Sequence, residues 1–157
     1  MAIIDKNLEF ADATSVGPPN NTTVNVGDVI DLGAAGNNVG DGEPMLFVVE
    51  VTTSIGSGGA ATVSFLLSSD SSSTLAVNGT QTVHFESDVF ALATVAAGFK
   101  IVVPLPWGNS GNSSYERYLG FQVKENAGQV LNAGAVNAYI TKNVRSWKAY
   151  AQASITD

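Results

Sequence analysis

Two apolar segments, residues 98–108 and 117–123, constrain the fold of this chain more than any other part of it. The first segment is rich in β-branched residues and ends at a corner made by Pro104 and Pro106, because proline cannot continue a strand ladder. The second segment opens on Arg-Tyr-Leu. We predict two core strands joined by a polar loop. Neither segment contains a catalytic pattern, so the pair indicates a small all-β protein that works by surface contact.

Short apolar pieces separated by glycine continue along the rest of the chain, which has 16 glycines among its 157 residues. With these two strands, at 99–105 and 118–124, included, the predicted strands are residues 24–32, 45–51, 61–67, 80–90, 99–105, 118–124 and 134–141. Short strands at such regular spacing are typical of a sandwich or barrel, and their number and size suit a jelly roll. The sequence therefore predicts one domain, residues 21–143, with a jelly-roll-like β-sandwich of about eight strands.

One segment, residues 87–97, has a helical alternative because its alanine content favours a helix. Its β-branched and aromatic residues favour a strand followed by a loop, which is the structure we expect.

The two terminal segments lie outside the sandwich pattern. Residues 1–20 end in a Gly-Pro-Pro loop that cannot continue a ladder, so we expect an N-terminal arm or an edge strand. Residues 144–157 form a C-terminal tail that carries Arg145, Trp147 and Tyr150. This tail either contacts a partner or folds back as an edge strand, with Trp147 covering one end of the core.

Charge and composition exclude several partners. The formal net charge is −7, with 14 acidic and 7 basic residues, so we expect no binding to nucleic acid or to an anionic membrane. The absence of cysteine excludes disulfides and thiolate metal sites. Residues 1–6 lack the features of a signal peptide, and the apolar runs are too short to span a bilayer. A soluble product made in a cytoplasm is the expectation.

The only histidine is the first candidate for chemistry. Strand alternation would place His84, Glu86 and Asp88 on one face, opposite Val83 and Phe85. A metal site or an acid–base site is one interpretation, but a single imidazole without a second nitrogen or sulfur ligand is a poor transition-metal site. No Gly-x-Ser-x-Gly motif accompanies it. We predict a solvated strand face.

A second candidate lies in the acidic loop that contains Asp41 and Glu43. Calcium needs more oxygen ligands at set positions than this loop offers. A strand-connecting turn is therefore the expected structure. The sequence predicts no catalytic residue, no metal and no cofactor.

The order of the segments resembles that of the capsid cement (decoration) proteins of tailed phages, typified by the one on a short-tailed Bordetella phage. The matching pieces are residues 5–10, 12–13, 29–33, 42–46, 60–63, 98–102, 105–106 and 117–119, and the resemblance extends to about residue 139. The loop at 109–116 and the tail after Val144 depart from it.

The resemblance implies a jelly-roll-like sandwich that binds the outer surface of an icosahedral shell in the virion. Such a protein would bridge neighbouring major capsid subunits as a homo-oligomer, with a homodimer favoured over a trimer, without touching DNA. Large aromatic residues beside turns or termini are less often central core residues, and the tail adds a basic side chain. We therefore expect contacts to the partner from Phe10, Trp107, Arg145, Trp147 and Tyr150.

Other function classes stay open. A carbohydrate-binding sandwich could use Trp107 with Asn109 and Asn112. A receptor-binding module of a phage tail would be expected to form a trimer. A hydrolase would depend on His84 or Asp88, for which the sequence shows no companion residues.

Overall fold

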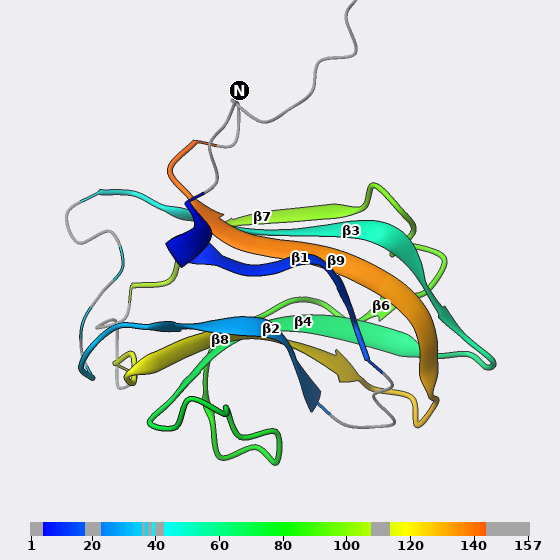
Figure 1. The fold of residues 1–157 in the computed structure, drawn as a ribbon. Helices are drawn as coiled ribbons and strands as arrows, with labels where there is room; N and C mark the ends of the chain where they lie inside the picture. The colour runs from blue at the N-terminus through cyan, green and yellow to red at the C-terminus, as the bar shows by residue number, and fades with distance from the viewer. Residues whose placement is uncertain are drawn as a thin grey trace, which may run out of the picture.

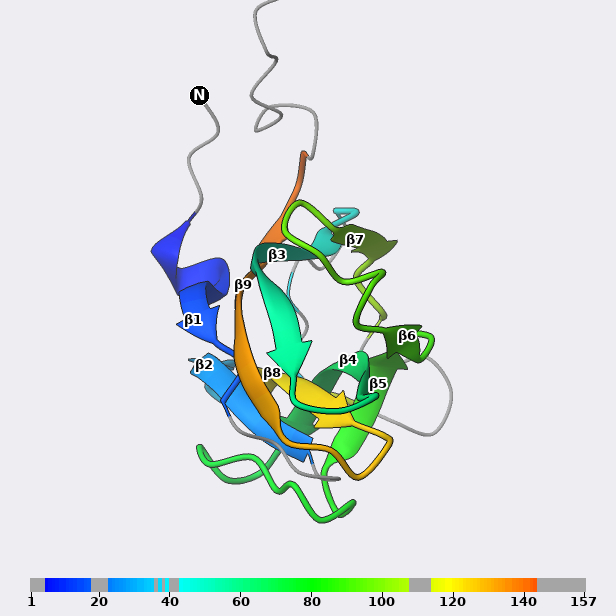
Figure 2. The same cartoon turned by 90° about the vertical axis from the view of Figure 1, so that its right-hand side faces the viewer.

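The computed structural model describes residues 5–17, 23–35, 37, 39, 43–107 and 114–143. Two antiparallel sheets lie face to face, one above the other in Figure 1 and end-on in Figure 2. The prediction of an all-β sandwich is confirmed. Among the described residues, no helix has the length and apolar character needed to cross a membrane.

Each sheet contains strands from distant parts of the chain. The first sheet has the order β1 (Glu9–Ser15), β9 (Leu131–Thr141), β3 (Leu46–Ser57), β7 (Lys100–Pro104), and the 3₁₀ turn η1 (Lys6–Leu8) precedes β1. The second sheet has the order β2 (Thr23–Asp31), β8 (Tyr118–Glu125), β4 (Thr62–Asp70), β5 (Thr82–Glu86), and β6 (Phe90–Ala91) also pairs with β4. The chain changes sheet after β1, β2 and β3, and again after β6, β7 and β8. This path agrees with jelly-roll-like connectivity.

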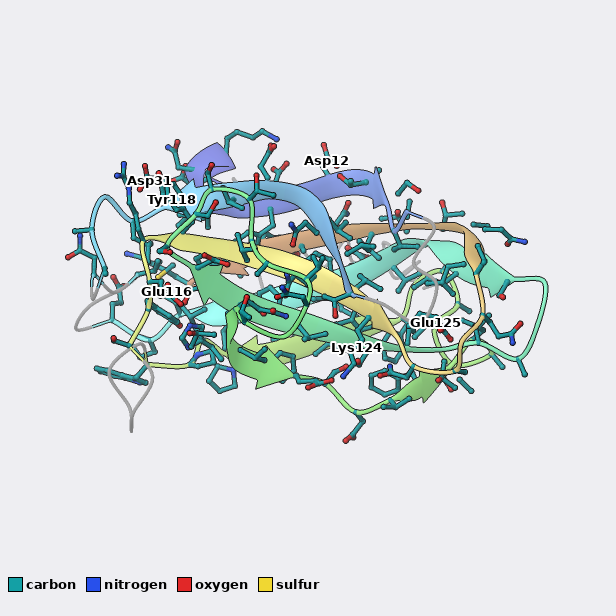
Figure 3. All side chains as sticks on the ribbon, turned by 90° about the horizontal axis from the view of Figure 1, so that it is seen from below. Asp12, Asp31, Glu116, Tyr118, Lys124 and Glu125 are labelled. Atoms are coloured by element: carbon teal, nitrogen blue, oxygen red, sulfur yellow. The ribbon has the colours of Figure 1, made fainter. Side chains whose placement is uncertain are left out.

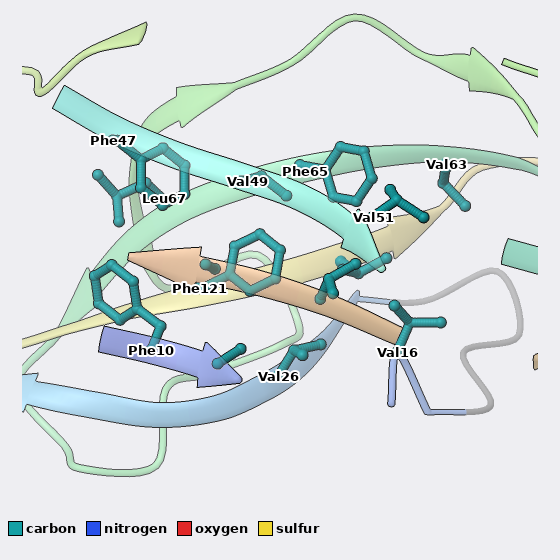
Figure 4. Close-up of a cluster of buried hydrophobic side chains, with 14 of the residues drawn as sticks. Phe10, Val16, Val26, Phe47, Val49, Val51, Val63, Phe65, Leu67 and Phe121 are labelled. Atoms are coloured by element: carbon teal, nitrogen blue, oxygen red, sulfur yellow. The ribbon is translucent and has the colours of Figure 1, made fainter. Parts of the chain in front are cut away.

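The core lies between the sheets and is built on aromatic rings. Phe47 of β3 faces Phe121 of β8 with ring centroids 6.1 Å apart, and Phe121 stacks on Phe65 of β4 at 6.2 Å (Figure 4). All three side chains are at most 1% exposed. Strand alternation produces this core, because every second residue of each strand points to the facing sheet.

The N-terminal segment supplies an edge strand, since β1 pairs with β9. Phe10 is 1% exposed and packs edge-to-face on Phe47 at 6.0 Å (Figure 4). The expectation that Phe10 contacts a partner is therefore wrong. Its position near the N-terminus suggested the surface, but pairing of β1 with β9 turns its side chain inward.

Two strand predictions need correction or refinement. Segments 98–108 and 117–123 do form strands that contribute to the core, but β7 is an edge strand of the first sheet, whereas β8 lies inside the second. The outward residue Val102 of β7 is 41% exposed. Residues 87–97 form the short strand β6 followed by a turn, in which the amide of Thr94 donates to the carbonyl of Ala91 at 2.9 Å. Strand followed by loop is thus confirmed.

A bulge in β2 brings the two sheets together along one side. The β2–β8 register shifts between Asn25 and Val29, and Gly27 within this bulge has a φ of +78°. A Cβ atom on Gly27 would overlap the backbone carbonyl of Phe10 in β1. Only glycine meets both demands, a left-handed backbone and direct contact with a neighbouring main chain.

Replacement of Gly27 by alanine tests this closure. Gly33 is a matched control, because its φ is +80° but nothing lies within 4 Å of an added Cβ. Gly33→Ala should cost about 1 kcal/mol of unfolding free energy through backbone strain alone. Gly27→Ala should cost about 3 kcal/mol or more, since the clash with β1 adds to the strain. Urea unfolding measures both, and equal midpoints for the two variants would contradict the proposed contact.

Candidate functional site

A bulge in β5 determines where the side chains around His84 point. Leu67 of β4 pairs with Phe85 and Ser68 pairs with Val83, so His84 has no residue opposite it. Phe85 points inward, 6.0 Å from the ring of Phe47, whereas Val83 is 40% exposed. The prediction that Val83 and Phe85 share a face is wrong, because the extra residue reverses the alternation.

His84 is held inside this corner of the sandwich and is only partly exposed. Its Nε2 lies 2.7 Å from Ser69 Oγ, which also accepts a hydrogen bond from the amide of Glu116 at 3.0 Å. The imidazole packs edge-on against Tyr115 with ring centroids 4.4 Å apart. Burial lowers the pKa of His84 to about 4, so the ring is neutral at pH 7. The solvated face expected from the sequence is instead a half-buried contact.

Ser69 and His84 lie as close together as a catalytic nucleophile and its general base would, but the serine is not accessible to a substrate. Ser69 is 0% exposed, so a substrate cannot reach its hydroxyl group. Tyr115 donates its phenol proton to the carbonyl of Pro106, which ties the segment before β8 to the end of β7. The cluster therefore joins β4, β5 and the segment before β8.

The two carboxylates expected beside His84 lie in other surroundings. Glu86 pairs with Lys124 at 3.3 Å and accepts a hydrogen bond from Ser64, and Asp88 lies beyond the end of β5. Within the described ranges, no group of three histidine, cysteine or acidic residues could hold a metal ion. In the acidic loop, Glu43 pairs with Lys142, while Asp41 lies outside the described residues.

A buried carboxylate that the sequence analysis missed closes the turn between β8 and β9. Glu125 is 1% exposed and accepts hydrogen bonds from the amides of Ala127, Gly128 and Gln129 at 2.8, 2.8 and 3.0 Å (Figure 3). These charge-assisted hydrogen bonds replace the water that the carboxylate loses on folding. The sequence signal was a lone Glu at the end of an apolar strand, before Asn-Ala-Gly.

The outer face of the second sheet is covered by the chain itself. Residues 71–81 run beneath β2, β8 and β4 in Figure 1. Leu75, which is 2% exposed, lies over Gly120 of β8. Gln122 of β8 donates to Asn25 Oδ1 at 2.8 Å and to the carbonyl of Ala76 at 2.9 Å. These contacts hold the segment on the sheet, so part of this face is covered by the chain itself.

The outer face of the first sheet presents apolar residues at its β7 side. Leu46 of β3 pairs with Pro104 of β7, and Val102 lies in the next row beside Val48. Trp107, just beyond the strand, is 67% exposed, the highest value among the large hydrophobic residues of the described chain. We use the name β7 patch for Leu46, Val102 and Pro104 at this end of the sheet together with Trp107, which belongs to the segment after β7, where the chain turns toward the second sheet (Figure 1).

The β7 patch contains one of the predicted contact residues. Trp107 lies on the surface, as a contact residue must. Arg145, Trp147 and Tyr150 lie outside the described residues, as do Asn109 and Asn112 of the carbohydrate alternative. The patch is therefore the candidate interaction surface of the described fold.

The contribution of the Glu125 hydrogen bonds to stability can be tested by removing the charge of this side chain. Glu125→Gln keeps the size of the side chain but replaces one acceptor oxygen with an NH₂ group that faces backbone amides. We expect a loss of about 3 kcal/mol in unfolding free energy. Glu86→Gln removes a carboxylate from the more exposed pair with Lys124 and should cost less than about 1 kcal/mol. If the Glu125→Gln protein is as stable in urea as the Glu86→Gln protein, the hydrogen bonds of Glu125 contribute little to the free energy of unfolding.

The buried His84 predicts a dependence of stability on pH. The unfolded chain protonates His84 near its ordinary pKa of 6.5, whereas the folded protein does so only near pH 4. The contribution of the neutral ring is therefore complete above about pH 6.5 and is lost progressively as the pH falls toward 4. In urea titrations at several pH values, His84→Gln should lose less stability over this range than the unmodified protein does. Parallel curves would contradict the assignment.

Comparison with known proteins adds one match. The sequence model described as Bbp16 matches residues 10–140, which extend from β1 to β9 and include both sheets. The name indicates a Bordetella phage protein, which agrees with the phage resemblance at this coarse level. No curated protein matches the chain. Because the match covers most of the chain and nearly all of the sandwich, this protein belongs to the Bbp16 family.

Proposed function

We propose that this protein is a structural component of a phage virion that binds the outer surface of the icosahedral capsid. In this proposal each copy bridges neighbouring major capsid subunits and strengthens the shell. The observation that carries the proposal is the exposed Trp107, 67% accessible at the end of a strand of the sandwich. The phage family match supports the virion setting.

The charge of the chain suits an outer position. A net charge of −7 opposes contact with packaged DNA, which a protein on the inner surface would meet. Many modest contacts suffice, because each copy that holds two capsid subunits converts the second contact into an intramolecular one. A homodimer, or a trimer, would extend the bridge further.

The geometry of β7 favours contact through its face rather than its edge. The strand has five residues, begins with Lys100 and ends with Pro104, and short edges that carry lysine and proline resist the addition of another strand. Trp107 and Val102 instead offer apolar area beside this edge. Tryptophan is enriched among residues that dominate binding energy at interfaces. The proposal requires no catalytic residue and no cofactor.

Co-sedimentation with phage shells tests the proposal. The protein should bind expanded, cement-free shells saturably, at a fixed ratio to the major capsid protein, and should raise the temperature at which they burst. Trp107→Ala should weaken binding by at least about 10-fold, as expected for loss of a central aromatic anchor. Val89→Ala serves as the control, because Val89 is 56% exposed but lies between β5 and β6.

Two outcomes would count against the shell-binding proposal. Failure to bind any mature shell would overturn it. Equal binding by the Trp107→Ala and Val89→Ala proteins would remove the β7 patch from the contact surface while leaving shell binding intact.

A carbohydrate-binding or receptor-binding module of a phage tail is the second candidate. The exposed indole of Trp107 favours it, because aromatic faces stack on sugar rings. Binding of the isolated protein to a glycan array, lost in Trp107→Ala, would establish this candidate in place of the first.

A further inference from the structure

The backbone that leads into Trp107 is restrained before it leaves the first sheet. Residues 104–107 read Pro-Leu-Pro-Trp, and each proline ring fixes its own backbone angle φ at about −65°. Leu105, between the two prolines, is 7% exposed, and its amide donates to the carbonyl of Met45, just before β3, at 2.8 Å. The chain then turns from β7 toward the second sheet (Figure 1). Little conformational freedom is therefore left on the N-terminal side of Trp107.

A second restraint acts on the peptide group that joins Pro106 to Trp107. The phenol of Tyr115 donates a hydrogen bond to the carbonyl oxygen of Pro106, and this carbonyl shares its peptide group with the amide nitrogen of Trp107. Tyr115 is 1% exposed, and burial raises the pKa of its phenol to about 12, so the hydroxyl group stays a donor at neutral pH. Because a peptide group is planar, holding its oxygen restricts the direction in which Trp107 leaves the fold.

Tyr115 is itself fixed by contacts to the second sheet. Its ring lies edge-on against His84 of β5 with ring centroids 4.4 Å apart. The next residue, Glu116, donates its amide to Ser69 Oγ of β4 at 3.0 Å and accepts a hydrogen bond from Thr82 Oγ1 of β5 at 2.8 Å. These contacts connect the segment to two neighbouring strands, so the phenol oxygen of Tyr115 has a defined position relative to the sheet.

The side chain at the end of this restrained backbone is exposed. Trp107 is 67% exposed, so the contacts beneath it do not serve to bury its ring. A residue whose backbone is already ordered loses less conformational entropy when a partner binds it. The restraint therefore favours binding through the indole more than it favours packing of the indole within the fold.

We propose that Tyr115 is a positioning residue for Trp107, which holds the peptide group before Trp107 so that the indole is presented to its partner in one orientation. The two prolines of the Pro-Leu-Pro-Trp run restrict the same stretch of backbone. This inference rests on the proposed function for the contact that Trp107 makes with the shell, whereas the restraint itself is a property of the free protein.

Fluorescence anisotropy measures the restraint without any shell. The chain has two tryptophans, so Trp147→Phe leaves Trp107 as the only reporter. In this background, Tyr115→Phe keeps an aromatic ring against His84 but removes the hydroxyl group that binds Pro106. The nanosecond component of the Trp107 anisotropy decay should then grow about 2-fold in amplitude, because the freed backbone moves on that timescale. An unchanged decay would overturn the proposal.

Tyr118→Phe is the matched control. Tyr118 begins β8, and the guanidinium carbon of Arg117 lies 5.0 Å from the centre of its ring, a contact that phenylalanine keeps. This variant loses a hydroxyl group three residues further along and should leave the Trp107 decay unchanged. A change as large as that of Tyr115→Phe would show that the restraint is not specific to Tyr115 and would overturn the assignment. Urea unfolding establishes that both variants are folded.

A double-mutant cycle relates the restraint to shell binding. Tyr115→Phe should weaken co-sedimentation with expanded shells about 5-fold, through the added cost of ordering Trp107 on binding. In the Trp107→Ala protein, Tyr115→Phe should have no further effect, because a positioning residue acts only through the side chain that it positions. Equal losses with and without the indole would overturn the proposal. Failure of the unmodified protein to bind shells would overturn the proposed function alone, since the anisotropy decay tests the restraint in the free protein.

Discussion

Packing of the two sheets through Phe47, Phe65 and Phe121 is the interaction on which the rest of the structure depends. These rings are at most 1% exposed and come from three strands of two sheets. Their burial removes apolar area from water, which is the main favourable contribution to folding. Because the chain has no disulfide, the arrangement of the strands depends on this core continuing to exclude water.

Local contacts then hold the two sheets and their connecting segments together at the edges and ends of the sandwich. Gly27 lets β2 approach the backbone of Phe10, and Glu125 binds the amides of the turn between β8 and β9. The cluster of His84, Ser69 and Tyr115 fixes the opposite corner. The last two of these use groups that resemble functional residues, a buried carboxylate, a histidine and a serine, yet their contacts connect one part of the fold to another. Residue types that often take part in catalysis or binding therefore stabilise the fold in this protein.

The two outer faces differ, and this difference directs the functional proposal. Residues 71–81 cover the second sheet through Leu75 and the hydrogen bonds of Gln122. The first sheet offers an apolar patch at β7 and Trp107. The capsid binding that we propose would need a surface that is rigid underneath and apolar on top. A patch at the end of a strand meets that need.

The sequence by itself determined the all-β class and most strand positions, because alternation and glycine-rich turns are local properties. It also indicated that Trp107 is exposed. Only the tertiary structure decided that Phe10 is core, that β7 is an edge, and that a bulge at His84 turns Val83 outward. The amides that surround Glu125 became visible only there. The physical reason is that edges, bulges and burial depend on pairing between strands far apart in sequence, which local patterns do not record.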